Sequence, residues 1–403
     1  MRLLVVSQNF WPENFQINDI LSLLVQQGHE VDVLTGYPNY PEGQTYNGYN
    51  PWRIQREKWK GINIIRVPTV PRFKSRSFNL ALNYISFVIS ASVIAPFLFR
   101  GKICDAIFVY GTSPIIQCLP ASLLGWIKKT PVALWVQDLW PESVEATGHI
   151  KNIYILALIK ALVCFVYSRT DLILVQSQAF VNKIKSMTKN VNISYLPNSI
   201  NNFFLDDIFP HEVKLQSLKS GFNIVFAGNI GEAQAIPTIL DVAENLCLYK
   251  DIKFIFFGSG SKAHWLNDQI KKKGLDNVVY EGRYPLESMP SIINQSSVML
   301  VSLTNDEIFS LTIPNKIQAY MASGKPIIAS LNGEGARLVE LSGSGKSCAA
   351  ENASELSKVV IQFYKMNNSD LIKMGNNGRD YFKSNFSMDS LCKELIMKLG
   401  QLI

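Results

Sequence analysis

Short apolar runs alternate with longer amphipathic segments along the whole chain, and this alternation predicts parallel β-sheets with helices on both faces. One core rarely fills a chain of 403 residues, so we expect an α/β protein made of two doubly wound, Rossmann-like parallel-sheet domains in tandem. The expected strands are Leu3–Val6, Val31–Leu34, Ile62–Val67, Ala106–Val109, Val132–Val136, Leu172–Val175 and Ile193–Leu196, followed by Ile224–Ala227, Lys253–Phe257, Asn277–Glu281, Val298–Val301 and Ile327–Ala329.

The division between the two domains falls in a polar stretch with neither a helical nor a strand period. This stretch begins after Pro197–Asn198, and the next apolar run starts at Ile224. We therefore predict a first domain over residues 1–200 and a second over residues 201–385. A last amphipathic helix follows within residues 386–403.

A helix, a turn and a strand are predicted in succession late in the second domain. Ile317, Tyr320 and Met321 lie at helical spacing, Gly324 favours a left-handed stop, and Pro326 prevents continuation. The N-terminus of such a helix lies at the carboxyl edge of a parallel sheet, where free backbone N–H groups and the helix dipole favour an anion. This corner is suited to a nucleotide diphosphate, although plain α/β architecture produces the same pattern.

Charge is concentrated in one segment. The chain has a formal net charge of +7, and residues 51–102 contain ten basic residues against one acid, Glu57. Within this segment Phe78–Phe99 carries no charge, and its polar residues recur at helical spacing. A polar stripe on a long apolar helix indicates a helix in an interface, not a span, with an ordinary internal helix as the alternative. The polar stripe is Asn79, Asn83, Ser86 and Ser90.

Composition excludes several other classes of function. The six cysteines are scattered without metal-ligand spacing, and no zinc-hydrolase, serine-hydrolase or P-loop motif is present. The N-terminal apolar run is too short for a signal peptide, so we expect a cytoplasmic location. No cofactor, metal or nucleic acid is expected.

An ordered set of motifs resembles the family-four glycosyltransferases of GT-B fold over nearly the full length. Its members are Pro12-Glu13-Asn14-Phe15 after the first strand, Leu196-Pro197-Asn198-Ser199-Ile200-Asn201 at the hinge, Phe257-Gly258-Ser259-Gly260 and Glu281-Gly282-Arg283. The resemblance implies two domains that face each other across a cleft, with the C-terminal helix (residues 386–403) packing back on the N-terminal domain. It also implies an acceptor and membrane side in the first domain and a donor side in the second.

Three further stretches are similar to the branch that contains the N-acetyl-L-fucosamine transferases of bacterial O-antigen and capsule assembly. They are Thr35–Pro41, Trp135–Ser143 and Ala227–Gln234. This resemblance implies a UDP-sugar donor and an undecaprenyl-diphosphate-linked acceptor at the cytoplasmic face of the inner membrane. Donor residues carried over by position are Gly228, Asn229, Gln234, Gly258, Ser259, Gly260, Arg283, Thr312, Asn315 and Lys316, and acceptor or membrane residues are Asn14, Tyr37, Asn39, Arg72, Lys74 and Arg76.

The chain departs from the family pattern at the donor site. Leu311 and Ala319 stand where the family has a Glu-x7-Glu pair, and Asn229 and Gln234 stand where it has an Arg and a Lys. A diphosphate needs neutralising charge, so Lys316, Arg283 and Lys325 are the cations expected to replace them.

Two carboxylates are candidates for catalysis. Asp138 follows a buried strand at its carboxyl end, and Glu142 lies four residues further on. An ionised carboxylate there can act as a general base toward an acceptor hydroxyl; the structural alternative is a helix N-cap. The family retains anomeric configuration, whereas an indispensable Asp138 base would favour inversion, so the stereochemical outcome stays open.

Three functions remain compatible with the sequence. The first is a glycosyltransferase acting on a lipid-linked acceptor. The alternatives are a UDP-sugar 2-epimerase or hydrolase of GT-B fold, and a catalytically silent GT-B subunit that binds a partner.

Overall fold

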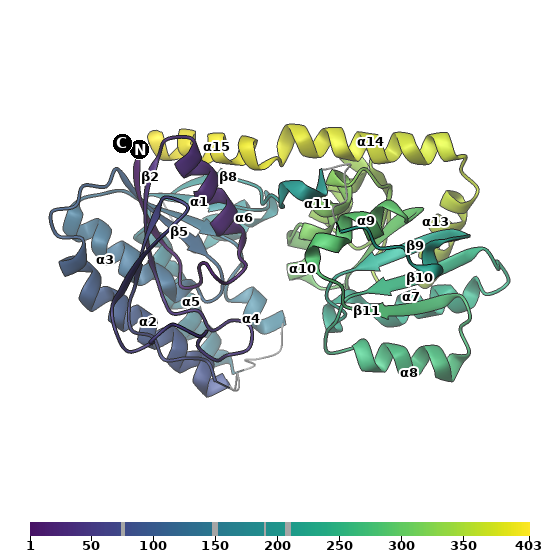
Figure 1. Ribbon diagram of the computed structural model, residues 1–403, viewed down its shortest axis with the longest axis horizontal. Coiled ribbons are helices and arrows are strands. Elements are labelled where there is room, and N and C mark those ends of the chain that lie inside the picture. Colours follow the sequence, from purple (N-terminus) through teal and green to yellow (C-terminus); the bar gives the residue numbers. More distant parts are fainter. Residues whose placement is uncertain (74–76, 147–151, 189–190, 206–210) are drawn as a thin grey trace. The chain divides into compact units, whose positions relative to one another are not determined.

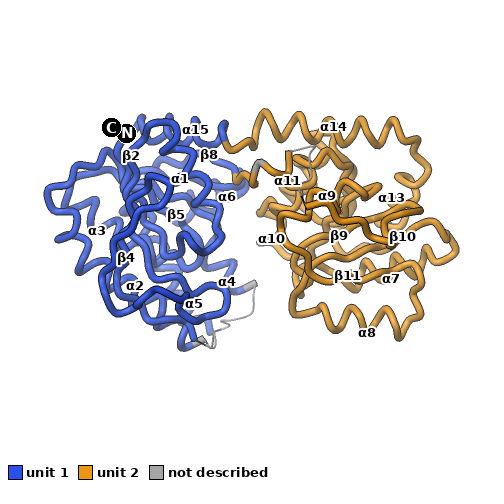
Figure 2. Tube along the Cα trace, in the orientation of Figure 1, with its two compact units in different colours: residues 1–197, 389–403 blue, residues 198–388 orange. Residues whose placement is uncertain are grey.

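The chain forms two compact units, shown in separate colours in Figure 2. The computed structural model describes residues 1–73, 77–146, 152–188, 191–205 and 211–403. Unit 1 comprises residues 1–197 and 389–403, and unit 2 comprises residues 198–388.

Unit 1 is built on an eight-stranded sheet with the order β3-β4-β2-β1-β5-β6-β7-β8 (Figure 1). All its neighbouring strands are parallel except β3 and β4. The strands are β1 Arg2–Val6, β2 Glu30–Thr35, β3 Gln55–Trp59, β4 Ile62–Arg66, β5 Ala106–Gly111, β6 Val132–Val136, β7 Leu172–Val175 and β8 Asn192–Tyr195. The helices are α1 Gln16–Gln26, α2 Ser77–Leu98, α3 Cys118–Lys128, α4 Glu142–Ala146, α5 Ile153–Ser168, α6 Ala179–Met187 and α15 Met388–Gly400, with the short 3-10 helix η1 Ile115–Gln117.

Unit 2 is built on a six-stranded, all-parallel sheet with the order β11-β10-β9-β12-β13-β14. Its strands are β9 Phe222–Ala227, β10 Ile252–Phe257, β11 Val278–Gly282, β12 Val298–Ser302, β13 Ile327–Ser330 and β14 Gly345–Cys348. Its helices are α7 Ile236–Asn245, α8 Ala263–Lys273, α9 Met289–Asn294, α10 Glu307–Leu311, α11 Asn315–Ala322, α12 Glu334–Leu341, α13 Ala353–Tyr364 and α14 Asn368–Asn385. The short 3-10 helices of this unit are η2 Asn202–Phe204, η3 Gln216–Leu218, η4 Glu232–Gln234 and η5 Leu286–Ser288.

Every strand expected from the sequence is present, and β3 and β14 were not expected. Both lie at an edge of their sheet, and neither is an apolar run: β3 reads QREKW and β14 reads GKSC. An edge strand needs little burial because one of its sides faces solvent, so the hydrophobic pattern does not reveal it.

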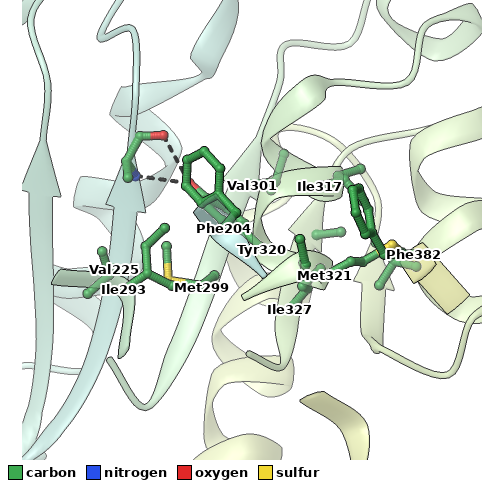
Figure 3. Packing of buried hydrophobic residues seen from close by; sticks show 14 of the residues in the cluster. Phe204, Val225, Ile293, Met299, Val301, Ile317, Tyr320, Met321, Ile327 and Phe382 are labelled. Carbon is green, nitrogen blue, oxygen red and sulfur yellow. Dashed lines mark hydrogen bonds between the residues drawn. The ribbon is translucent and has the colours of Figure 1, made fainter. Parts of the chain in front are cut away.

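The predicted helix-turn-strand corner of the second domain is confirmed. Ile317, Tyr320 and Met321 are buried in the apolar cluster of Figure 3, Gly324 has φ +67°, and β13 begins at Ile327. The Tyr320 hydroxyl also donates to the Ala227 carbonyl at 2.9 Å and accepts from the Ala227 amide at 3.1 Å, the dashed lines in Figure 3. These bonds tie α11 to the carboxyl end of β9.

The last helix, α15, is part of unit 1. Lys398 Nζ donates to Ser194 Oγ at 2.6 Å beside β8, and Leu391, Leu395 and Leu399 are buried. The spacing of these leucines gives α15 one apolar face, which explains why it packs on unit 1.

Candidate functional site

In each sheet the strand order reverses once, between β1 and β5 in unit 1 and between β9 and β12 in unit 2. Open parallel sheets bind ligands outside the carboxyl ends of the strands at such a switch point, because the loops there diverge to opposite faces. The loops that follow these strands are therefore the candidate ligand-binding regions of the two units.

Two glycine loops are pressed together at the switch point of unit 2. Gly228 follows β9 with φ +133°, and Gly258 follows β10 with φ +134°. A Cβ on Gly258 would lie 1.8 Å from the Gly228 carbonyl oxygen, and the Ile230 amide donates to the Ser259 carbonyl at 2.9 Å. A Cβ on Gly260 would likewise lie 2.3 Å from the Ile230 carbonyl oxygen. Only glycine permits this approach, so the two loops form one backbone surface.

Gln234 and Asn229 brace the loop after β9. Gln234 Oε1 accepts from the Gly231 amide at 3.0 Å and from Asn229 Nδ2 at 3.3 Å. The Thr304 amide, just beyond β12, donates to the Ala233 carbonyl at 2.9 Å. These bonds hold the loop across the switch point between β9 and β12.

Lys316 brings a cation to this loop. It is the second residue of α11, its Nζ lies 3.8 Å from the Phe226 ring centroid, and its Cε would lie 2.5 Å from a Cβ on Gly228. Burial lowers the pKa of the Lys316 ammonium from 10.5 to about 7. Among the described residues, Lys316 forms no ion pair with a carboxylate. A cation held in such a desolvated position is suited to bind an anion that enters the loop.

The remaining donor candidates lie in different settings. Thr312 Oγ1 donates to the Ile308 carbonyl at 2.9 Å at the end of α10, and Asn315 Oδ1 accepts from Asn198 Nδ2 at 3.5 Å. Arg283 is exposed in the loop after β11. Lys325 differs from the expectation, because its Nζ donates to the Asn294 and Ser296 carbonyls at 2.6 and 3.0 Å. It precedes β13 at the amino edge of the sheet, so it is not a cation of the loop site.

Gly258→Ala should reduce the free energy of unfolding by ~3 kcal/mol or more, because the new methyl group meets the Gly228 carbonyl in an unfavourable backbone region. Gly274→Ala is the matched control, since Gly274 also has positive φ (+61°) but no atom within 4 Å of the Cβ position. It should cost only ~1–2 kcal/mol. Chemical denaturation measures both, and equal losses would contradict the close approach.

At the unit 1 switch point, Asp138 is bound to the neighbouring strand's loop. Its Oδ2 accepts from Ser113 Oγ at 2.7 Å and from the Ser113 amide at 3.2 Å, and Trp140 Nε1 donates to Ser113 Oγ at 2.9 Å. Among the described residues, Oδ1 has no partner. The N-cap interpretation does not apply, because α4 begins only at Glu142.

Glu142 lies in a different environment. Its charge contributes, after burial and Cys118, to raising the pKa of the buried Tyr167 hydroxyl on α5. Within the described part of the chain, Glu142 Oε2 and the Tyr167 hydroxyl are both buried without a hydrogen-bond partner. Pro141 directly precedes α4, and its carbonyl accepts from the Glu145 amide at 3.2 Å.

A row of amide side chains at this edge was not predicted from the sequence. Gln8 lies beyond β1, Gln137 follows β6 directly, and Gln176 follows β7 directly. Gln8 Oε1, Gln137 Nε2 and Gln176 Oε1 are buried without partners among the described residues. Hydroxyl groups satisfy amide oxygens and nitrogens equally well, so this edge is suited to a hydroxyl-rich ligand. The sequence signal that could have identified Gln137 and Gln176 is a polar residue immediately after a buried strand.

The side chains of most acceptor-side candidates contact other residues of unit 1. Tyr37 is buried and donates to the Arg53 carbonyl at 2.6 Å, whereas Asn14 is exposed. Asn39 Nδ2 donates to the Tyr37 carbonyl at 2.7 Å, and its Oδ1 is buried without a partner in the described ranges. Arg72 is buried, with its guanidinium 5.2 Å from the Tyr40 ring and 5.4 Å from the Tyr84 ring. It is therefore not an exposed lipid-contacting cation. Lys74 and Arg76 lie outside the described residues.

Glu13 was not singled out by sequence analysis, although it organises this corner. Its Oε1 accepts from the Asn39 and Tyr40 amides at 2.8 and 2.7 Å. Burial raises the pKa of the Glu13 carboxyl, opposed by these two bonds and by Arg72 and Arg66. Glu13 thus fixes the loop after β2 against the loop after β1.

Residues 221–366, within unit 2, match the family model described as glycosyl transferases group 1. The chain is 25% identical over 346 residues to the putative colanic acid biosynthesis glycosyl transferase WcaI of Escherichia coli, covering 80% of this chain and 82% of that protein.

Solved structures share the whole fold. A UDP-forming trehalose-phosphate synthase from Burkholderia xenovorans superposes with a TM-score of 0.73 at 13% identity, covering 100% of this chain and 99% of the other. Sucrose-phosphate synthase from Thermosynechococcus elongatus gives 0.71 at 14% identity, covering 100% and 98%. The Anabaena protein HepE in complex with UDP and glucose gives 0.68 at 13% identity, covering 99% of each chain.

The chain has the GT-B fold, with two Rossmann-like parallel-sheet domains and a C-terminal helix, as the sequence predicted. It is an enzyme, a nucleotide-sugar-dependent glycosyltransferase; its residues 221–366 match the group 1 model, and WcaI is a distant homologue.

Proposed function

We propose that the protein transfers a sugar from a UDP-sugar to an undecaprenyl-diphosphate-linked saccharide during O-antigen or capsule polysaccharide assembly. The main observation in support of a UDP-sugar donor is that Lys316 lies against the glycine loops at the unit 2 switch point. A single cation beside backbone amides matches a diphosphate, which needs both charge and close main-chain approach.

The known proteins support the two substrates separately. HepE is solved in complex with UDP and glucose, and the trehalose-phosphate synthase is UDP-forming, which supports UDP as the nucleotide. WcaI is a putative enzyme of colanic acid biosynthesis, which supports a polysaccharide product. Within this class we propose an N-acetylated amino or deoxy sugar such as N-acetyl-L-fucosamine as the donor sugar, on the motifs of the branch that the chain resembles.

The chemistry needs few groups. An acceptor hydroxyl attacks the anomeric carbon of the donor, the bond from that carbon to the UDP oxygen breaks, and UDP leaves with the electron pair. Lys316 neutralises the charge that develops on the leaving diphosphate. Asp138, with Oδ1 available, takes the hydroxyl proton, while the amides of Gln8, Gln137 and Gln176 position the acceptor's hydroxyl groups. We propose that the enzyme works without a cofactor or metal, at the cytoplasmic face of the inner membrane.

One assay separates this function from its alternatives. The protein is incubated with UDP-sugars in the presence and absence of a prenyl-diphosphate-linked acceptor, and products are identified by mass spectrometry. We expect UDP release and a lipid-linked product only when both substrates are present. Donor conversion without acceptor would identify an epimerase or hydrolase, and donor binding without any turnover would identify a silent subunit.

A further inference from the structure

The polar stripe of α2 lies on the inner side of this helix. Gln8 Nε2 donates to Asn83 Oδ1 at 2.8 Å, Asn83 Nδ2 donates to the Val70 carbonyl at 2.6 Å, and Ser86 Oγ accepts from the Val70 amide at 2.9 Å. Asn83, Phe87, Ala91 and Ala95 are buried at helical spacing. The sequence had suggested only that one face is polar. The structure shows that unit 1 itself bonds Asn83 and Ser86 of that face, whereas Ser90 Oγ is buried without a partner among the described residues.

The outer side of α2 is an uninterrupted apolar stripe. Phe78 is 72% exposed, Val93 60% and Phe97 75%, and Leu82, Ile85 and Ile89 fill the positions between them. Among the described helices, α2 alone is long and apolar enough to cross a membrane by length and composition. Its inner face packs on unit 1, however, so only one side of the helix is available for an apolar partner.

A second helix presents the same kind of surface. In α5, Tyr154 is 80% exposed and Leu158 71%, with Ile153, Ile155 and Phe165 also exposed, while Val163, Val166 and Tyr167 face inward. Trp126 and Ile127 add exposed side chains from the end of α3. Exposed apolar patches of this extent indicate an interaction site.

These helices lie on one face of the sheet. The connections β4–α2–β5, β5–α3–β6 and β6–α5–β7 all advance in the same direction along the strand order, and right-handed crossovers place such helices on the same side. Helix α3 packs against both α2 and α5. We call the outer residues of α2, α3 and α5 the apolar face.

The helices that form the apolar face contain no acidic residue, and cations lie on them or directly after them. Within α2, α3 and α5 there is no Asp or Glu, whereas Lys160 lies on α5, Lys129 follows α3 and Arg100 follows α2. These three cations are exposed, and no hydrogen bond or ion pair engages them within the described residues. A second copy of the chain would place like charges together, whereas anionic lipid headgroups neutralise them.

We propose that the apolar face inserts into the interfacial layer of an anionic bilayer, with α2 and α5 contributing comparably and with apolar burial, not charge, as the main attraction. This deepens the proposed function and rests on it, since a lipid-linked acceptor would be reached from that surface. It also changes the expected attachment, because the buried Arg72 cannot act as an electrostatic tether. A helix with one apolar side lies in the interface plane and does not span.

The test is co-sedimentation of the full chain with vesicles of phosphatidylcholine and phosphatidylglycerol. We expect Ile155→Ser with Leu158→Ser in α5, and separately Ile89→Ser with Val93→Ser in α2, to weaken partitioning by about tenfold or more at low salt and at about 1 M salt, where charge contacts are screened beyond about 3 Å. Leu248→Ser with Leu341→Ser is the matched control, because both leucines are exposed, at 84% and 60%, but belong to unit 2, and it should partition as wild type does.

A charge variant separates the two attractions. Arg100→Gln, Lys129→Gln and Lys160→Gln together should weaken partitioning at low salt and have no effect at high salt. Transfer to a short-chain, water-soluble acceptor should be unchanged in every variant. A wild-type protein that sediments with vesicles but transfers no sugar would count against the proposed function and not against the apolar face. Wild-type protein that fails to sediment, or α5 variants that sediment normally, would overturn the proposal. A dimer in size-exclusion chromatography that the same variants abolish would instead assign the face to a second copy.

Discussion

Asp138→Asn should lower kcat by ~10²–10⁴-fold while UDP-sugar affinity and the melting temperature stay near wild type, because a positioned general base contributes about that factor. Asn is isosteric, and its amide oxygen can still accept from Ser113 Oγ, so the loop between β5 and β6 keeps its geometry. Donor affinity should be unaffected since Asp138 belongs to unit 1 and the glycine loops belong to unit 2. Steady-state kinetics and donor titration measure the two effects.

Ser113→Ala tests how much the hydrogen bond that positions the Asp138 carboxylate contributes to turnover. It removes the hydroxyl that links Trp140 to Asp138 and leaves the carboxylate in place, so we expect a smaller loss of kcat than for Asp138→Asn. The anomeric configuration of the wild-type product is informative alongside it, since an inverted product fits an Asp138 base. Near-normal turnover in a folded Asp138→Asn protein would return this carboxylate to a structural role.

Lys316→Met should weaken UDP-sugar binding by about tenfold or more and at the same time raise protein stability. A hydrogen bond to a charged group contributes ~1.5–3 kcal/mol, which is lost with the ammonium. The stability gain follows from linkage: the folded-state pKa of about 7 lies below the ordinary 10.5, so below pH 7 folding carries a desolvated charge. Replacing Lys316 removes this cost, and calorimetry with thermal unfolding measures both changes.

The same pKa predicts how donor affinity depends on pH. Below pH 7 Lys316 is charged in the free protein and affinity should be highest; as pH rises through about 7 the amine becomes neutral and affinity should fall. The Lys316→Arg variant stays charged, so its donor affinity should be constant between about pH 6 and pH 8.5. The same pH dependence in wild type and Lys316→Arg would contradict the role of Lys316 in donor binding.

Lys325→Met is a second control for Lys316→Met. The Lys325 ammonium is bonded to two carbonyls at the other edge of the sheet, so this variant should lose stability and keep donor affinity.

Much of the fold was predictable because its signals are local. Val132–Val136 and Leu172–Val175 are apolar runs bounded by polar residues, and burial follows directly from that composition. The corner at Ile317, Gly324 and Pro326 was equally local, since helix period, glycine stop and proline are adjacent in sequence. The candidate residues Gly228, Gly258 and Lys316 could be placed at one edge for the same reason.

The chemical environment of those residues was not predictable. Lys325 and Lys316 are both lysines beside the same helix, yet one is bonded to carbonyls and the other lies over Phe226 against Gly228. Arg72 lies in a strongly basic segment but is buried between two tyrosine rings. Burial and partners depend on residues distant in the chain, which a local pattern does not contain.

By itself the sequence determined two parallel α/β units, the strand ends at which ligands collect, and an apolar helix with one polar stripe, because each depends on residue type repeated at short spacing. The tertiary structure decided which way that stripe turns, which lysine reaches the glycine loops and which amides remain unpaired. Those outcomes depend on contacts such as Asn83 with Gln8 and Gly258 with Gly228, which join segments 75 and 30 residues apart. Hydrogen-bond satisfaction and steric exclusion at such long-range contacts are settled only when the chain packs.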